Sequence, residues 1–277
     1  MAKAIGLIGN FKGKVGNMVG YQIPDSNTGN TQGIRIYQPV VKNPKTSAQA
    51  EQRAKLAPIN ATYRALKSII DRGNEGLPYG NKSRLAWLKG AFNAEYMPWF
   101  EKGKAVTAPV LCQLTKGSLP SFMLQPNADG IQVLCEGVTS ATAVNTIGAV
   151  STVLMAAYPF LKAGDQITVV SVENMGGNLY SNVFSFEIDA TSADAIAGIT
   201  ADEDTLQFEH FGVDAPAAVI ISRLGANGEH LRSSESLVAN TDFRQGAPYD
   251  DTSKTAAIAS YKASNSVNSD WAEESIQ

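Results

Sequence analysis

The sequence predicts an α+β protein, in which an N-terminal β-hairpin with two or three helices precedes an antiparallel β-sandwich region of Ig-like type. Three observations favour this architecture. Two short β-patterned runs occupy the first 41 residues, helical periodicity dominates residues 47–99, and seven short runs rich in valine, isoleucine and phenylalanine follow between turn residues. With 277 residues, the chain is long enough for about two domains.

Composition divides the chain into three predicted parts: a basic hairpin-plus-helices module (1–105), an acidic β-sandwich region (106–244) and a polar C-terminal tail (245–277). The first 105 residues hold 16 Lys and Arg against 6 Asp and Glu, whereas the remainder holds 7 against 20, so charges of +10 and −13 combine to −3. Such asymmetry is typical of a half that binds a polyanion or a partner. The alternative is attraction between the two halves or between basic and acidic faces of different copies, and protein–protein pairing is favoured over polyanion binding.

The composition disfavours three classes of protein: membrane-spanning, exported and disulfide-rich proteins. No apolar run approaches the roughly 18 to 20 residues that a membrane-spanning helix needs, and lysines and glycines interrupt the N-terminal segment before a signal-peptide core could form. We therefore expect no membrane partner and no export signal. Cys112 and Cys135 are too few for a disulfide framework and lie in apolar runs, so we expect buried free thiols.

Glycines recur at positions 6, 9, 13, 16 and 20 among apolar residues, which favours tight β-structure over helix. The spacing is not that of a phosphate-binding loop, because only three residues separate Gly9 from Gly13 and Val15 follows Lys14. The runs NMVGYQIP and GIRIYQPVV then flank DSNTGNTQG, predicting a hairpin with a long polar loop. In its second strand Arg35 and Tyr37 share one face, which is suited to a base or phosphate but is also typical of a solvated strand.

The stretch KNPKTSAQAEQRAKLA, residues 42–57, predicts the start of a helix. Asn43 precedes a proline and is disfavoured in helix, while Thr46 and Gln49 have the spacing of a capping box. The polar side chains that capping does not use, Gln52, Arg53 and Lys55, are left for a partner.

Two further helices are predicted after this start. Pro58 is expected to kink or divide the first helix, and a second helical run over 59–71 carries an apolar stripe. After the break GNEGLPYGN, Ser83 is expected to cap another helix with an aromatic-rich stripe. The two stripes comprise Ile59, Tyr63, Leu66 and Ile70, and then Leu85, Leu88, Phe92, Tyr96 and Trp99, with Trp87 and Met97 broadening the second.

The β-patterned region supplies seven predicted strands. FSFEI alternates whereas AVIIS does not, so we expect both edge and central strands. The polar tail is expected to hold a short helix over 253–263 that becomes ordered against a partner. The seven runs are APVLCQL, IQVLCEGV, AVSTVLMAAYP, DQITVVSVEN, LYSNVFSFEID, TLQFEHFG and AAVIISRLG.

The sequence carries no recognisable motif for catalysis. His210 and His230 have no second ligand at zinc spacing, and the acidic cluster around 202–209 lacks the donor pattern of an EF-hand. Neither a nucleophile elbow nor a Cys/His pair is suggested by local context. We therefore expect a non-enzyme with no cofactor and no metal site.

The segments GKVGNMVGYQ and VKNPKTSAQAEQRAKLA, with an arginine-bearing strand between them, carry a resemblance that covers about the first 60 residues. They resemble a family of uncharacterised proteins from Bacteroidetes and their gut phages, whose motif is GKxGNxVGY followed by KNPxTxxQxxQR. The loop DSNTGNTQG is longer than the family's usual turn. The matching residues are Gly13, Lys14, Gly16, Asn17, Val19, Gly20 and Tyr21, then Lys42, Asn43, Pro44, Thr46, Gln49, Gln52 and Arg53.

This resemblance implies no known activity, but it implies a phage virion component. We accordingly expect a head, neck or tail protein, made in the bacterial host cytoplasm, whose partners are other virion proteins and copies of itself in a homo-oligomer. The alternatives are a nucleic-acid-binding protein that uses the basic N-terminal module and a surface-binding adhesin or decoration protein. The candidate residues for partner or polyanion binding are Lys12, Lys14, Arg35, Tyr37, Lys42, Lys45, Gln52, Arg53 and Lys55.

Overall fold

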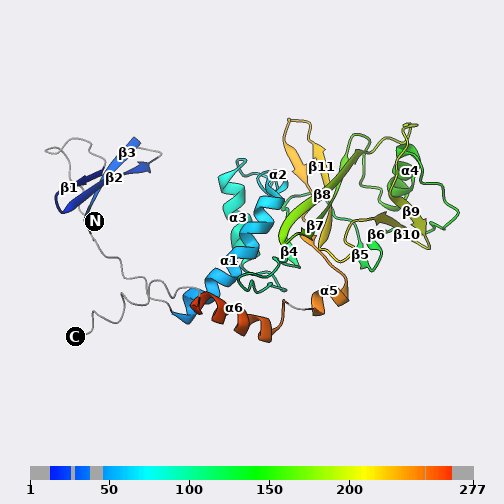
Figure 1. Cartoon of the computed structure of the whole chain (residues 1–277). Coiled ribbons are helices and arrows are strands. Elements are labelled where there is room, and N and C mark those ends of the chain that lie inside the picture. The colour runs from blue at the N-terminus through cyan, green and yellow to red at the C-terminus, as the bar shows by residue number, and fades with distance from the viewer. Residues whose placement is uncertain (1–12, 26–28, 38–45, 247, 264–277) are drawn as a thin grey trace. The chain divides into compact units, whose positions relative to one another are not determined.

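The computed structural model in Figure 1 describes residues 13–25, 29–37, 46–246 and 248–263. The chain divides into two compact units, one made of Met1–Pro44 with Trp271–Gln277 and the other of Lys45–Asp270. This division lies at residue 44 and not at the expected boundary near residue 105. Each unit is described by itself.

The described part of the first unit is an antiparallel sheet of three strands in the order β1-β2-β3: β1 (Gly13–Val15), β2 (Met18–Asp25) and β3 (Gly29–Ile36). Gly16 turns the chain between β1 and β2 with a φ of +57°, a conformation that glycine adopts without steric cost. The expected hairpin is confirmed, but its long loop is not. Pairing continues to Asp25↔Gly29, because the polar residues 29–32 extend β3 and add backbone hydrogen bonds.

The second unit begins with α1 (Ser47–Ala65), and its predicted cap is confirmed. The Thr46 hydroxyl oxygen accepts a hydrogen bond from the backbone N–H of Gln49 at 3.3 Å. The predicted division at Pro58 is wrong, since α1 runs through this residue. Proline deprives the Ala54 carbonyl of its helical donor, and the N–H of Phe100 supplies a replacement at 3.3 Å.

Two short helices follow, α2 (Lys67–Ile70) and α3 (Asn81–Ala91). The first stripe is confirmed, because Ile59, Leu66 and Ile70 are fully buried. Ser83 is not a cap: it lies inside α3, fully buried, and its hydroxyl donates to the Ile70 carbonyl at 2.6 Å. This bond joins the buried face of α3, which also carries Trp87 and Ala91, to the end of α2.

The second predicted stripe is correct only in part, because Trp87, Leu88 and Phe92 pack in the core whereas Leu85 does not. Leu85 is 54% exposed, whereas Trp87 is only 3% exposed. Tyr96 and Trp99 lie beyond the end of α3 at Ala91. The buried positions are spaced four residues apart from Ser83, so a polar residue that the sequence pattern did not count belongs to the buried face.

Two four-stranded antiparallel sheets and a two-stranded one form most of the rest of the unit. Their strand orders are β5-β6-β10-β9, β12-β11-β7-β8 and β13-β4. The α+β class with antiparallel sheets is confirmed. The strands are β4 (Cys112–Gln113), β5 (Leu124–Asn127), β6 (Gly130–Leu134), β7 (Gln166–Met175), β8 (Asn178–Glu187), β9 (Ile199–Asp202), β10 (Thr205–Glu209), β11 (Ala217–Leu224), β12 (His230–Arg232) and β13 (Ser236–Leu237).

Six of the seven predicted runs contain strands, and AVSTVLMAAYP is the exception. It forms α4 (Ile147–Ala157), whose N-cap is Thr146, with its hydroxyl oxygen accepting from the Ala149 N–H at 3.2 Å. A side-chain cap and an 11-residue length favour helix over the weak strand preference of its valines.

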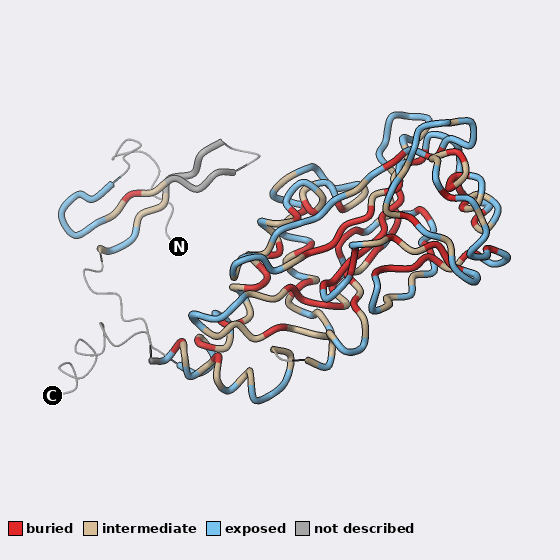
Figure 2. Tube along the Cα trace, turned by 45° about the vertical axis from the view of Figure 1, so that its right-hand side comes forward, coloured by how far each residue is buried: buried red, intermediate tan, exposed pale blue. Residues whose placement is uncertain are grey.

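The strands β7 and β11 are buried on both faces (Figure 2). On one face Val169 and Val219 join a core that both four-stranded sheets and α4 share. On the other face Val170 and Ala218 join a second core together with residues of α1, α2 and α3. This shared core explains why no boundary occurs near residue 105, and β8 lies at the sheet edge as its alternating pattern predicted.

The C-terminal segment contains α5 (Thr241–Gln245) and α6 (Asp251–Ala263). The predicted helix exists, but its partner is α1 of the same chain, beside which it lies in Figure 1. Ala54 and Ala257, both fully buried, belong to the cluster between α1 and α6. Across the described ranges, no helix combines the length and apolar character needed to span a membrane.

Candidate functional site

The three-stranded sheet gathers the described N-terminal candidates on one face. Lys14 of β1 pairs with Val19 of β2, and Val19 pairs with Arg35 of β3. Directly paired residues of an antiparallel sheet project to the same side, so the two cations lie in one row. Tyr37 follows β3, and its backbone N–H donates to the Asn17 carbonyl at 2.7 Å.

An exposed cation and an aromatic ring are in contact on this face. The Lys14 Nζ lies 3.5 Å from the centroid of the Tyr37 ring, an interaction worth about 0.5–1 kcal/mol at an exposed position. Arg35 is exposed, and within the described residues no carboxylate forms an ion pair with it. The face therefore offers guanidinium and ammonium donors to a carboxylate or phosphate of a binding partner.

The opposite face of this sheet is apolar. Val15, Met18 and Ile36 form one row through the pairs Val15↔Met18 and Met18↔Ile36. Their exposed fractions are 59%, 40% and 76%, respectively. The alternation of Ile34 and Ile36 with polar residues indicates an apolar face in the sequence. That this face is exposed is visible only in the structure.

On α1, only part of the predicted polar surface is open. Gln52 and Arg53 are exposed. Lys55 instead lies 3.4 Å from the Glu51 carboxylate and 5.0 Å from the Trp99 ring centroid. Lys254 of α6 approaches the same two groups at 3.5 and 5.0 Å.

This arrangement assigns Lys55 to the contact between α1 and α6, so it is a poorer candidate for partner binding than its neighbours. The remaining candidates, Lys12, Lys42 and Lys45, lie outside the described residues. The structure therefore brings Lys14, Arg35 and Tyr37 together and places Gln52 and Arg53 on an exposed helix surface of the other unit.

A buried carboxyl group that sequence reasoning missed lies close to β13. Glu235 is only 4% exposed, its backbone N–H donates to the Thr115 hydroxyl oxygen at 3.1 Å, and its Oε1 has no hydrogen-bond partner in the described part of the chain. Burial raises the pKa of Glu235 to about 7, and hydrogen bonds with Ser233 and Ser121 only partly oppose that shift. This burial makes Glu235 a determinant of stability and leaves no open surface for chemistry at its carboxyl group.

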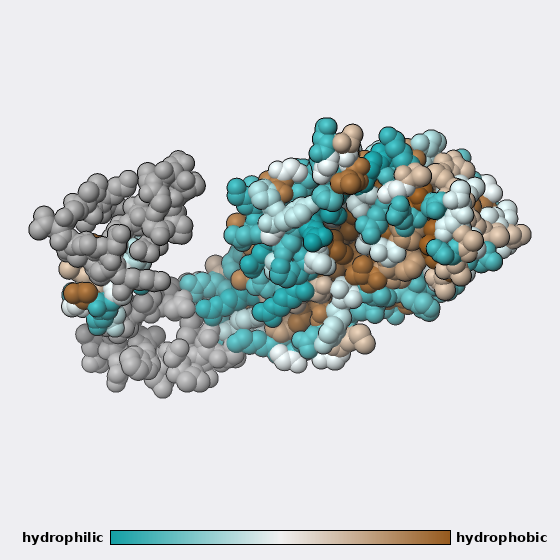
Figure 3. Space-filling view, turned by 90° about the horizontal axis from the view of Figure 1, so that it is seen from above, coloured by the Kyte–Doolittle hydropathy of each residue, from teal (hydrophilic) through white to brown (hydrophobic). Residues whose placement is uncertain are grey.

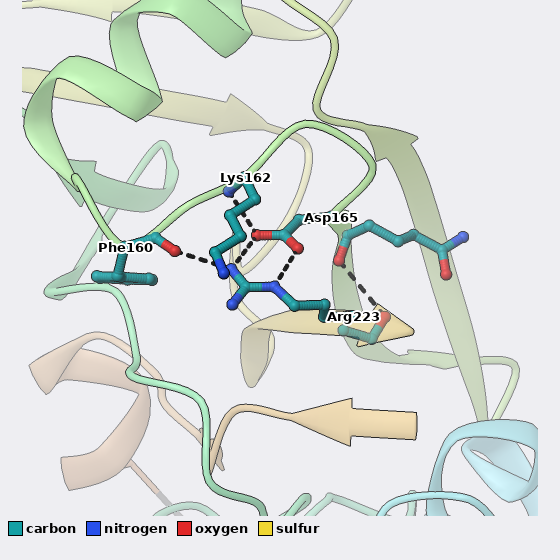
Figure 4. Close-up of polar contacts among 6 residues, drawn as sticks. Phe160, Lys162, Asp165 and Arg223 are labelled. Atoms are coloured by element: carbon teal, nitrogen blue, oxygen red, sulfur yellow. Dashed lines mark hydrogen bonds and ion pairs between the residues drawn. The ribbon is translucent and has the colours of Figure 1, made fainter. Parts of the chain in front are cut away.

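A second polar group in the core is fully paired (Figure 4). The Arg223 Nε and Nη2 atoms each donate to one oxygen of the Asp165 carboxylate, both at 2.6 Å. Arg223 also donates to the Phe160 carbonyl at 2.8 Å, and the Lys162 N–H donates to Asp165 at 2.8 Å. This bidentate pair joins β11 to the loop before β7 and has a structural role.

The other surfaces offer little that is typical of catalysis. Hydrophilic residues cover much of the second unit in Figure 3, with apolar residues interspersed among them. No group of three or more His, Cys, Asp or Glu within the described ranges is arranged to hold a metal ion. The acidic residues near 202–209 form the turn between β9 and β10, where the Asp204 carboxylate accepts from the Gly137 N–H at 2.7 Å.

The residues with candidate function thus belong to two surfaces, the sheet of the first unit and the outer side of α1. Both suit contacts with another macromolecule, because they present side chains on open surfaces and not in a cleft. Comparison of the chain with models of protein families, with curated proteins and with solved structures finds no match in any of the three.

Proposed function

We propose that this chain is a non-enzymatic structural protein of a phage virion, a head, neck or tail component that acts through protein–protein contacts in a multi-copy assembly. The observation that carries the proposal is the exposed apolar row Val15, Met18 and Ile36 on the small sheet of the first unit. A three-stranded sheet needs a packed face to be stable, and exposed apolar patches mark sites of protein contact.

Three further features support this function. The resemblance of the first 60 residues is to a family found in phages, and its motif GKxGNxVGY coincides with β1, β2 and the turn between them. The long edge strand β3 can pair with a strand of another chain. The acidic β-region, proposed to be an Ig-like sandwich, would then meet the basic module of a neighbouring copy or another virion protein.

The proposal is tested by the concentration dependence of the molar mass in size-exclusion chromatography with light scattering. The wild-type mass is expected to rise above 29.4 kDa with increasing concentration. Replacement of Val15 and Ile36 by serine is expected to cost about 2 kcal/mol of contact energy, which is roughly a 30-fold weaker association. Met175→Ser is the matched control, since Met175 is 61% exposed but lies in the second unit.

Circular dichroism of each variant checks that the fold is retained. A wild-type chain that stays monomeric at high concentration and also fails to bind any virion fraction would contradict the proposal. Equal weakening by the control variant would show that the apolar row is not the contact.

Nucleic-acid binding is the second candidate function, and the row Lys14–Val19–Arg35 beside Tyr37 favours it. Each phosphate neutralised by a cation releases counterions, so the affinity for DNA or RNA falls steeply with salt. Fluorescence anisotropy with labelled oligonucleotides at low salt measures this affinity. Replacing Lys14 and Arg35 by glutamine is expected to reduce the salt slope by about 2, whereas Lys89→Gln on α3 leaves it unchanged.

Absence of binding at low salt would eliminate this second function.

A surface-binding adhesin or decoration protein is the third candidate, in which the β-region is the binding part. Binding of whole virions to host cells after deletion of the gene, compared with complemented virions, separates the third candidate from the first.

A further inference from the structure

Arg72, Tyr79 and His230, from distant parts of the sequence, meet on the surface of the second unit, and Arg232 follows His230 by two residues on the same strand. Arg72 follows α2, Tyr79 precedes α3, and His230 and Arg232 lie in β12. The Arg72 Cζ lies 5.6 Å from the centroid of the Tyr79 ring, and the centroids of the Tyr79 and His230 rings are 6.2 Å apart. These four residues are called the Arg72–Arg232 cluster below.

His230 and Arg232 are two residues apart in β12, so their side chains project to the same face of the strand. Burial lowers the pKa of the Arg232 guanidinium, the charge of Arg72 lowers it further, and Tyr79 opposes both effects. In the described part of the chain, neither guanidinium forms an ion pair with a carboxylate. This differs from Arg223, whose charge is matched by Asp165 in the same unit.

The carboxylate of Glu75, which lies nearby, is committed to other donors. It accepts hydrogen bonds from the backbone N–H of Ser118 at 2.9 Å, from the Ser118 hydroxyl at 2.8 Å and from the backbone N–H of Arg232 at 3.2 Å. Glu75 therefore connects the loop after α2 to residue 118 and to β12. It holds the backbone of the cluster in place and does not form an ion pair with the two guanidinium groups.

The loop that carries Arg72 and Tyr79 is also held by backbone hydrogen bonds. The Lys116 N–H donates to the Gly73 carbonyl at 2.9 Å, and the Glu75 N–H donates to the Lys116 carbonyl at 2.8 Å. The cluster is thus positioned before any ligand arrives, which reduces the entropic cost of binding. Tyr79 remains 54% exposed, so the cluster is open to solvent.

We propose that the Arg72–Arg232 cluster is a binding site for the phosphate group of a phosphate monoester. One guanidinium group lies beside the Tyr79 ring and the other projects from the same face of β12 as His230; together they match the two negative charges of a phosphate dianion and can donate hydrogen bonds to its oxygens. A monocarboxylate would balance only one of the two charges. The exposed ring of Tyr79 lies where the organic part of the ligand would pack. This inference does not depend on the proposed virion function.

The chain holds only two histidines, which gives a direct test by nuclear magnetic resonance. His230 belongs to the cluster, while His210 lies in the turn after β10 and serves as an internal reference. Inorganic phosphate is titrated into the full chain at constant ionic strength, with chloride as the balancing anion. The expected result is a saturable shift of the His230 imidazole signals and no matching shift of His210.

Arg72→Gln tests the assignment, because Arg72 is exposed and its replacement is expected to preserve the fold. It should weaken the apparent affinity for phosphate about tenfold or more. Arg64→Gln, at an exposed position in the last turn of α1, is the matched control and should leave the affinity unchanged. A second titration with a nucleoside monophosphate measures the contribution of an organic group next to Tyr79.

Several results would overturn the proposal. These are the absence of a saturable His230 shift, equal shifts of His230 and His210, or an unchanged phosphate affinity in Arg72→Gln. Tighter binding of the nucleoside monophosphate than of phosphate supports a monoester as the ligand, whereas binding of inorganic phosphate alone refutes that part of the assignment.

Discussion

Replacing Glu235 by glutamine tests how a buried carboxyl group determines the stability of the second unit. The side chain is 4% exposed, and burial raises the pKa of Glu235 from its ordinary 4.5 to about 7. Between these two values the folded chain keeps the proton and the unfolded chain releases it. The contribution of Glu235 to the free energy of unfolding is therefore greatest below pH 4.5. It falls as the pH rises toward 7.

The expected loss follows from the size of the shift. A difference of roughly 2.5 pH units corresponds to about 3 kcal/mol, at 1.36 kcal/mol for each unit. Glutamine has nearly the same shape and carries no charge at any of these pH values. The Glu235→Gln variant should therefore gain about 3 kcal/mol over wild type between pH 4.5 and pH 8.

Urea unfolding followed by tryptophan fluorescence measures this difference, since Trp87 is 3% exposed in the folded chain. Comparing variant with wild type at each pH cancels the contributions of all other titrating groups. Glu229→Gln is the matched control, because Glu229 is exposed in the turn before β12. A difference between Glu235→Gln and wild type that stays constant across the pH range would refute the reasoning.

The other predictions concern packing and thiol reactivity in the second unit. Arg223→Gln should lower the free energy of unfolding by about 3–5 kcal/mol because it leaves Asp165 buried without its partner; adding Asp165→Asn should restore part of the loss in the same urea assay, and strict additivity would contradict this. Ala257→Leu should cost about 1–3 kcal/mol by overfilling the α1–α6 contact and should increase protease cleavage in α6; unchanged cleavage would argue against that packing. Burial raises the pKa of both Cys112 and Cys135 to about 12, so a thiol reagent at pH 8 should label two thiols only after unfolding; rapid labelling of the native chain would exclude this burial.

The elements that the sequence predicted well are those with strong local causes. Thr46 caps α1 because a hydroxyl three residues before an N–H satisfies that donor whatever the helix packs against. The continuous apolar run AAVIIS predicted a central strand, and β11 is buried on both faces. Strand alternation likewise placed Arg35 and Tyr37 on one face, and the sheet register adds Lys14 to the same row.

The incorrect predictions have tertiary causes. Pro58 should have interrupted a helix, but the distant Phe100 supplies the hydrogen bond that proline omits. Ser83 was read as a cap from its residue type, although its hydroxyl meets the Ile70 carbonyl inside the protein. Lys55 was predicted to contact a partner, whereas in the structure it forms an ion pair with Glu51 and lies over the Trp99 ring at the α1–α6 contact.

The sequence by itself determined the helix start at Thr46, most strands, the antiparallel α+β class and the free state of both cysteines. Each depends on interactions among neighbouring residues or on average burial, which composition and periodicity record. Only the tertiary structure decided that α1–α3 share a core with β7 and β11, that Glu235 is buried, and that Arg72, Tyr79 and His230 meet. Those features join residues that are distant in the sequence, and no local pattern encodes such contacts.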